Sequence, residues 1–355
     1  MIENLIITFG EPVVLCAAGA LTGIVFGLSA QHSRFCLRAA TVEFAALKIG
    51  PSVAVWLIAF SAAVAATQWM IVFNLFDSSE ARQIASTGSM SGAIIGGLMF
   101  GVGMVLARGC ASRLLVLSST GNLRAIISGL VLTLVAQMSL TGALAPAREY
   151  LGNLWLVQGG PRRDLLTLLH ISHGTAALIA SLAVVIGWWL AFRNAVKTSR
   201  IIASTIVGLA VALGWLLTYV VKSNSFELVS ITSVTFAGPS TDTLMTLVNT
   251  RDVVLSFSLG LVPGVFAGGF IAALATREFK IQRFGEDTPM ERYLIGATLM
   301  GFGAMLAGGC AVGAGVSGGA IMATTAWIAV FFMWIGSVGT SIVMGWAPKR
   351  APAIV

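Results

Sequence analysis

The sequence carries little charge for its length. Only 10% of its 355 residues are Asp, Glu, Lys or Arg, whereas 57% are apolar and the mean hydropathy is +0.92. Soluble domains carry about 25% charged residues, so this composition excludes a water-soluble globular protein. The chain is therefore expected to form one all-α integral membrane domain over residues 1–355, surrounded by a lipid bilayer.

Acidic residues are missing from the long apolar segments. A hydrocarbon core of about 30 Å needs about 20 helical residues. Seven charge-free segments have that length, and an eighth is long enough for two crossings, which predicts about nine transmembrane helices. Because none of the segments contains Asp or Glu, a carboxylate proton relay of the kind found in many pumps is excluded. The segments are residues 12–33, 49–76, 83–107, 125–147, 165–192, 201–221, 253–276 and 293–348.

Positive charge is shared unevenly between the loops. The net charge of +7 is not gathered into one patch, so it gives no indication of nucleic-acid binding. With the N-terminus outside, six of the 21 Lys and Arg fall on its side and the other 15 on the opposite side. Lys and Arg accumulate in cytoplasmic loops, which predicts a periplasmic N-terminus and a cytoplasmic C-terminus. The six residues are Arg82, Arg148, Arg162, Arg163, Lys222 and Arg251.

Metal-ligand patterns are also absent. The four cysteines form no Cys-x-x-Cys pair, and the three histidines complete no zinc motif. We therefore expect no metal and no cofactor. Cys16 lies inside a continuous apolar segment and is expected to pack in the core. Cys36, Cys110 and Cys310 each stand beside an interruption of the helical pattern.

An internal repeat relates two parts of the chain. A shift of 200 residues places residues 96–111 on 296–311 with eight identities in sixteen positions, and it places Cys110 on Cys310. An odd number of predicted crossings separates the copies, so they are expected to run in opposite directions, as inverted repeats do. The expected halves are residues 11–145 and 251–348, with connecting spans and loops over 146–250. A second, weaker similarity pairs Gly19, Gly23 and Gly27 with Gly260, Gly264 and Gly268. Close packing of helices is the simpler explanation for it.

The segments beside these cysteines are poor helix formers. Residues 308–319 contain six glycines in twelve positions, and each glycine inside a helix costs about 1 kcal/mol relative to alanine. Non-helical backbone at membrane depth is tolerated only inside protein or beside a water-filled cavity. We therefore predict short re-entrant half-helices after Cys110 and after Cys310. A third short helix is expected from a cap at Ser33 to about Lys48.

The chemistry of these positions indicates an anion that contains sulfur. Thiols are soft, polarisable and weak hydrogen-bond donors, which suits sulfur better than a hard oxyanion such as phosphate. Helix N-termini carry about half a positive charge each, and broken helices bring those ends into the membrane. Thiols beside such ends can pass a sulfur anion along weak, successive sites.

Four motifs resemble the YeeE/YedE family of sulfur-transport membrane proteins, in order and spacing over nearly the whole chain. The resemblance implies a thiosulfate uptake protein of the bacterial inner membrane, not an enzyme, built from two pseudo-symmetric inverted halves. It also implies a pathway lined by Cys36, Cys110 and Cys310, with Arg34, Gly109 and Gly309 beside them, and a cytoplasmic sulfur-carrier partner of the TusA type. The motifs are Arg34-Phe35-Cys36-Leu37, Gly109-Cys110-Ala111, Thr276-Arg277-Glu278-Phe279 and Gly308-Gly309-Cys310.

The chain departs from the family pattern beside two of the cysteines. Arg108 replaces the first glycine of a Gly-Gly-Cys motif, Arg113 stands where a small or polar residue is usual, and Ala314 interrupts a Gly-Asn-Gly type of turn. These changes leave the cargo open among thiosulfate, sulfite, sulfide and a selenium compound. An alternative of a different class is a membrane sulfurtransferase or thiol oxidoreductase, in which a cysteine takes up sulfur as a persulfide.

Overall fold

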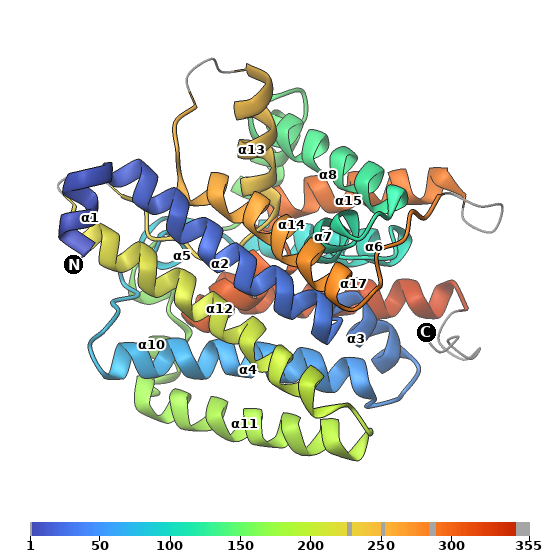
Figure 1. Ribbon diagram of the computed structural model, residues 1–355, viewed down its shortest axis with the longest axis horizontal. Coiled ribbons are helices and arrows are strands. Elements are labelled where there is room, and N and C mark those ends of the chain that lie inside the picture. The colour runs from blue at the N-terminus through green and yellow to red at the C-terminus, as the bar shows by residue number, and fades with distance from the viewer. Residues whose placement is uncertain (1, 226–228, 250–252, 284–288, 346–355) are drawn as a thin grey trace.

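Helices make up almost all of the regular structure in the computed structural model, which describes residues 2–225, 229–249, 253–283 and 289–345 (Figure 1). Eight of the described helical segments are long and apolar enough to cross a membrane, and a pair bent by 40° after Leu306 gives a ninth span if counted as one. This confirms an all-α membrane protein with about nine spans. Arg251, Lys349 and Arg350, which contribute to the predicted charge distribution, lie outside the described residues.

The long helices lie side by side, and α1 and the end of α17 are at opposite ends of the bundle (Figure 1). The only strands in the described ranges, β1 and β2, are two residues each and pair antiparallel. The elements are α1 (Ile2–Phe9), α2 (Glu11–Ser33), α3 (Leu37–Ala45), α4 (Pro51–Val72), α5 (Arg82–Ala85), β1 (Gly88–Ser89), α6 (Met90–Leu106), α7 (Ala111–Ser119), α8 (Leu123–Thr141), α9 (Ala145–Asn153), β2 (Leu156–Val157), η1 (Pro161–Arg163), α10 (Leu165–Leu169), α11 (His173–Arg193), α12 (Thr198–Ser223), α13 (Ala237–Asn249), α14 (Phe257–Ala275), α15 (Met290–Leu306), η2 (Ala311–Ser317), α16 (Gly318–Ala320) and α17 (Thr324–Val343).

Glycines let α2 and α14 touch along their length. A Cβ atom at Gly19 or Gly27 would collide with the backbone of α14, and one at Gly260 or Gly268 would collide with the backbone of α2. Successive glycines of α2 meet successive turns of α14 in the same order, so the two helices run parallel. The two matching glycine series are therefore the two sides of one interface, which confirms the packing explanation for their similarity.

The two copies of the internal repeat, α6 and α15, pack against each other in opposite directions. Gly96 in α6 abuts the end of α15, and Gly296 in α15 abuts the end of α6. The contacts to other helices are equally reciprocal, because Gly101 abuts α17 and Gly301 abuts α8. Residues related by the 200-residue shift therefore make equivalent contacts on the two sides of this helix pair.

Three short helices begin directly after a cysteine. α3 follows Cys36, α7 follows Cys110, and η2, a stretch of π-type turns that leads into α16, follows Cys310. π-type turns are rare and are frequently found at functional sites. The half-helices predicted after Cys110 and Cys310 thus appear as α7 and as η2 with α16.

The boundaries predicted for the first short helix were wrong. α2 continues to Ser33, whose hydroxyl donates to the Ser29 carbonyl at 2.6 Å and so serves its own helix instead of capping the next. The chain then turns at Arg34, which has a left-handed φ of 58°, and α3 ends at Ala45. Cys36, not Ser33, precedes the first turn of α3.

Candidate functional site

Each of three cysteines occupies the position before the first turn of a short helix. Cys36, Cys110 and Cys310 are 7%, 0% and 0% exposed. The first N–H groups of a helix lack partners within it and carry partial positive charge. At Cys310 one of them, from Gly313, donates to the sulfur at 3.5 Å. At Cys110 the sulfur interacts with Ser112 Oγ at 3.3 Å. The three sulfurs are therefore buried at the positive ends of helices.

Cys16 has a different setting from the other three. It lies in the interior of α2 and is only partly buried. Its backbone carbonyl group packs against Gly260 of α14. The backbone of Cys16 thus belongs to the α2–α14 interface, and the residue stands beside no break in a helix.

Cys36 and Cys110 come together in the fold. Their thiols are close enough to hydrogen-bond to each other, and the Arg113 guanidinium lies within electrostatic range of both. Arg113 is in the first turn of α7, so its charge adds to that of the helix N-terminus. Cys310 begins η2, which contacts α7. The structure therefore pairs two of the predicted thiols beside a cation and places the third at the start of a neighbouring half-helix.

Polar side chains connect the thiol pair to the surface. Arg113 Nη1 donates to Gln31 Oε1 at 3.2 Å, and Gln31 Nε2 donates to Glu278 Oε2 at 2.7 Å. Glu278 Oε1 in turn forms an ion pair with Arg34 Nη2 at 3.3 Å. Gln31 is 4% exposed, whereas the side chains of Arg34 and Glu278 are 32% and 36% exposed. These contacts join α7, α2 and the segment after α14 into one polar connection from the buried thiols to the outside.

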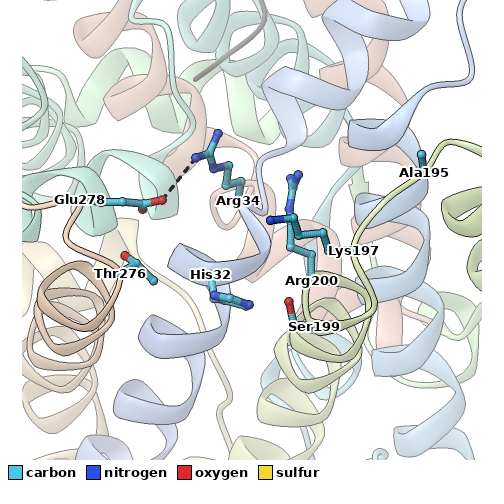
Figure 2. A pocket seen from close by; sticks show the side chains of 8 residues that line it. All are labelled: His32, Arg34, Ala195, Lys197, Ser199, Arg200, Thr276 and Glu278. Atoms are coloured by element: carbon cyan, nitrogen blue, oxygen red, sulfur yellow. Dashed lines mark hydrogen bonds and ion pairs between the residues drawn. The ribbon is translucent and has the colours of Figure 1, made fainter.

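A pocket of about 410 Å³ opens where this connection reaches the surface (Figure 2). Figure 2 shows Thr276 and Glu278 on one side of it and Lys197 and Arg200 on the other, with Arg34 between them. Arg200 Nη2 also donates to the Ser33 carbonyl at 3.2 Å, which ties α12 to the end of α2. Three Lys or Arg side chains and one carboxylate make the pocket electropositive. Its lining residues are His32, Arg34, Ala195, Lys197, Ser199, Arg200, Thr276 and Glu278.

The glycines before two of the cysteines are not equally constrained. A Cβ atom at Gly309 would lie 2.6 Å from the Ala314 nitrogen, whereas at Gly109 the nearest atom, in the Leu114 side chain, would be 3.2 Å away. One residue earlier, Gly308 has φ +78° and Arg108 has φ +55°. This left-handed region favours glycine, so Arg108 keeps the backbone turn of the glycine that the family pattern would place there.

Several polar residues of this region were not predicted as part of a site. Glu278 was noted only within a motif, and Gln31, Lys197 and Arg200 were given no role. The available signal for Gln31 was an amide at the end of an apolar helix, where a polar side chain needs a partner. In the described part of the chain, no three His, Cys, Asp or Glu side chains gather as they would around a metal ion.

Comparison with known proteins identifies the family. The family profile described as Sulphur transport matches residues 32–339. The thiosulfate transporter TsuA of Escherichia coli (strain K12) is 28% identical over 361 aligned positions, which cover 94% of this chain and 96% of that protein. The thiosulfate transporter TsuA of Spirochaeta thermophila is 27% identical over 333 positions, which cover 90% of this chain and 96% of that protein. Because the profile covers most of the sequence, from His32 through all three short helices that follow a cysteine, this chain belongs to the sulphur transport family.

Proposed function

We propose that this protein carries thiosulfate across the bacterial inner membrane into the cytoplasm. The family profile, the apolar helices and two relatives named as thiosulfate transporters support a transporter of a small sulfur anion and fit a protein that is not an enzyme. The observation that carries the proposal is that three buried thiols stand at helix N-termini, two of them beside Arg113.

This arrangement is suited to a dianion with a soft terminal sulfur. A charge buried without compensation is very costly, and the partial positive charge of three helix starts together with Arg113 offsets part of that cost. A thiol donates only weakly, so each cysteine holds the sulfur end briefly. Weak successive sites allow the ion to leave, as permeation requires.

We infer a route that passes Cys310 first, then the Cys36–Cys110 pair. Cys110 follows the end of α6, which lies beside the start of α15, and Cys310 follows the end of α15, which lies beside the start of α6. The two cysteines therefore lie toward opposite ends of this helix pair. From Cys110 the route continues past Arg113 and Gln31 to the pocket. The pocket is on the side where Lys and Arg accumulate, which the charge distribution predicts to be cytoplasmic.

The packing supports two inverted halves that are longer than the sequence repeat. Under the exchange of α6 with α15, the series α2, α3, α4, α6, α7 and α8 corresponds to α12, α13, α14, α15, η2 with α16, and α17. Two pairs of contacts follow this exchange. α7 packs on α14 as α16 packs on α4, and α3 packs on α17 as α13 packs on α8. α3 and α13 begin at Leu37 and Ala237, again 200 residues apart. We therefore propose halves of residues 11–141 and 198–343, in which α12 and α13 belong to the second half and do not merely connect.

The pocket is also a suitable place for the ion to be collected. Its Lys and Arg side chains, among them Arg34 and Lys197, would attract an acidic surface or a small anion. We propose that a cytoplasmic sulfur-carrier protein of the TusA type docks at this end of the bundle and receives the ion.

Uptake of labelled thiosulfate tests the transport proposal. Cells that carry Cys36→Ala, Cys110→Ala or Cys310→Ala are expected to lose most of their uptake, because each change removes one of the successive sites. Cys16→Ala is the matched control, since Cys16 lies in the interior of α2 and does not precede a short helix, and it should retain normal uptake. Normal uptake in both Cys110→Ala and Cys310→Ala would contradict the thiol route.

A competition experiment in liposomes identifies the cargo. Sulfite, sulfide and selenium compounds are each added with labelled thiosulfate, and the compound that lowers thiosulfate uptake shares the pathway.

The pair of touching thiols also fits a second candidate, a sulfurtransferase or thiol oxidoreductase. In that mechanism a cysteine thiolate would take the outer sulfur of thiosulfate as a persulfide and release sulfite in each cycle. Mass spectrometry of the purified protein during turnover separates the two functions. Transport predicts unmodified Cys36, Cys110 and Cys310, whereas an obligatory added sulfur on one of them favours the enzyme.

A further inference from the structure

Glu278 is the one acidic side chain that lines the electropositive pocket. Both of its carboxylate oxygens are engaged, one by the Arg34 guanidinium at 3.3 Å and the other by the Gln31 amide at 2.7 Å. Gln31 is in turn held by Arg113. The carboxylate therefore lies between the buried cation next to the thiols and the cations of the pocket.

The cations around Glu278 outnumber it. Arg200 is within electrostatic range of Arg34, of Arg113 and of Glu278, and Lys197 lines the same pocket. Without a nearby negative charge, such a cluster would hold an oxyanion firmly, because charged hydrogen bonds are about twice as strong as neutral ones. A transport pathway needs the opposite at its exit, where binding must be weak enough for release.

We propose that Glu278 is a built-in competitor for the transported anion. The proposal rests on the transport function proposed above. An anion that moves from the Cys36–Cys110 pair toward the pocket reaches the donors of Arg113, Gln31 and Arg34, of which Gln31 and Arg34 are occupied by the carboxylate. The arriving anion displaces the carboxylate, and the carboxylate displaces the anion into the pocket when it returns. Glu278 thus sets how tightly the exit holds its ligand and how fast the ligand leaves.

The location of Glu278 allows this movement. Its side chain is 36% exposed, and its backbone is fixed independently, because its N–H donates to the Ala273 carbonyl at 2.8 Å. The carboxylate can therefore swing into the pocket while α14 stays in place. A pocket of about 410 Å³ has room for the carboxylate, a small oxyanion and several waters, each of which takes about 30 Å³ in the liquid.

The test compares Glu278→Gln with the unchanged chain, with thiosulfate as the probe. Glutamine keeps the size of the side chain but removes its charge and one of the two oxygens that accept from Arg34 and Gln31. In detergent-solubilised full-length protein, the thiosulfate Kd measured by calorimetry should fall about two- to fivefold, the range that a partly exposed ion pair accounts for. In liposomes the maximal uptake rate should fall at the same time. Glu291→Gln, which removes an exposed acid at the start of α15 outside the pocket, should change neither quantity.

The two measurements separate the possible outcomes. If Glu278 only bridges α2 and α14, Glu278→Gln will weaken binding or leave it unchanged, and the inference is wrong although transport stands. If the unchanged chain neither binds nor transports thiosulfate, the proposed function is wrong and this inference falls with it.

Where Glu278→Gln is not recovered folded, Glu278→Asp replaces it. The shorter side chain cannot reach both Arg34 and Gln31, so a competitor role predicts tighter binding here too, and unchanged or weaker binding contradicts it.

Discussion

Arg113 in the first turn of α7 donates a hydrogen bond to Gln31 near the end of α2 at 3.2 Å. This contact joins a half-helix to the first long helix and holds a cation beside two thiols. Within the described residues, no carboxylate lies at ion-pair distance from Arg113. A buried cation without such a partner favours a passing anion, which gives Arg113 a part in the proposed route.

Replacing Arg113 by Gln should lower the rate of thiosulfate uptake at least about tenfold, a loss of about 1.4 kcal/mol of stabilisation. Lysine at this position keeps the charge but not the planar fork of donors, so its effect should be smaller. Initial uptake rates in liposomes over a range of thiosulfate concentrations measure both. Arg124→Gln, which removes a cation at the start of α8, is the matched control. Equal rates for Arg113→Gln and Arg124→Gln would show that Arg113 has no special role.

The contact between Cys36 and Cys110 predicts that they can be joined by oxidation. All four cysteines are free thiols, and those of Cys36 and Cys110 are close enough to hydrogen-bond to each other. A small movement should therefore bring their Cβ atoms to the separation of about 3.5–4.5 Å that a disulfide requires. Copper phenanthroline should form a Cys36–Cys110 disulfide in the chain that carries Cys16→Ala and Cys310→Ala. Peptide mapping should find that link, and dithiothreitol should reverse it. Two free thiols after treatment would contradict the contact.

The sequence was sufficient to predict the membrane spans and the places where helices break. Charge-free segments of about 20 residues allow little else in a bilayer, so the all-α class and about nine spans followed directly. The Gly-rich run after Cys310 predicted a break because glycine is a poor helix former. The glycine series of α2 and α14 could likewise be explained as packing, since no polar group was involved.

The polar connection could not be predicted, because it depends on contacts between distant segments. Gln31 and Glu278 are 247 positions apart, and their hydrogen bond arises only because α2 and α14 end side by side. Arg200 reaches Ser33 for a similar reason. The proposed correspondence of α3 with α13 also leaves little trace in the sequence, because Cys36 matches Phe236 and no thiol marks the second copy.

The tight contact between α2 and α14 predicts that a larger residue will disrupt it. A Cβ atom at Gly260 would collide with the Cys16 carbonyl, and excess volume in a packed core costs about 1–3 kcal/mol or more. Gly260→Val should therefore lower the thermal stability of the purified protein markedly. Gly339→Val is the control, because Gly339 lies in α17 with no atom within 4 Å of its added Cβ. A similar melting temperature for the two variants would contradict the close approach of the helices.

The turn before Cys310 predicts an effect of backbone conformation alone. Gly308 has φ +78°, and an added Cβ atom there would meet nothing within 4 Å. Alanine in the left-handed region costs roughly 1–2 kcal/mol, so Gly308→Ala should destabilise the protein by that amount without any steric clash. Gly129 in α8 is also free of contacts but is helical, and there alanine should stabilise by about 0.5–1 kcal/mol. The opposite signs of the two changes, measured as free energies of unfolding in detergent, distinguish a left-handed turn from a continuous helix. If both changes stabilise, residues 306–311 form an uninterrupted helix, Cys310 no longer stands at a helix start, and the positive end assigned to its thiol is lost.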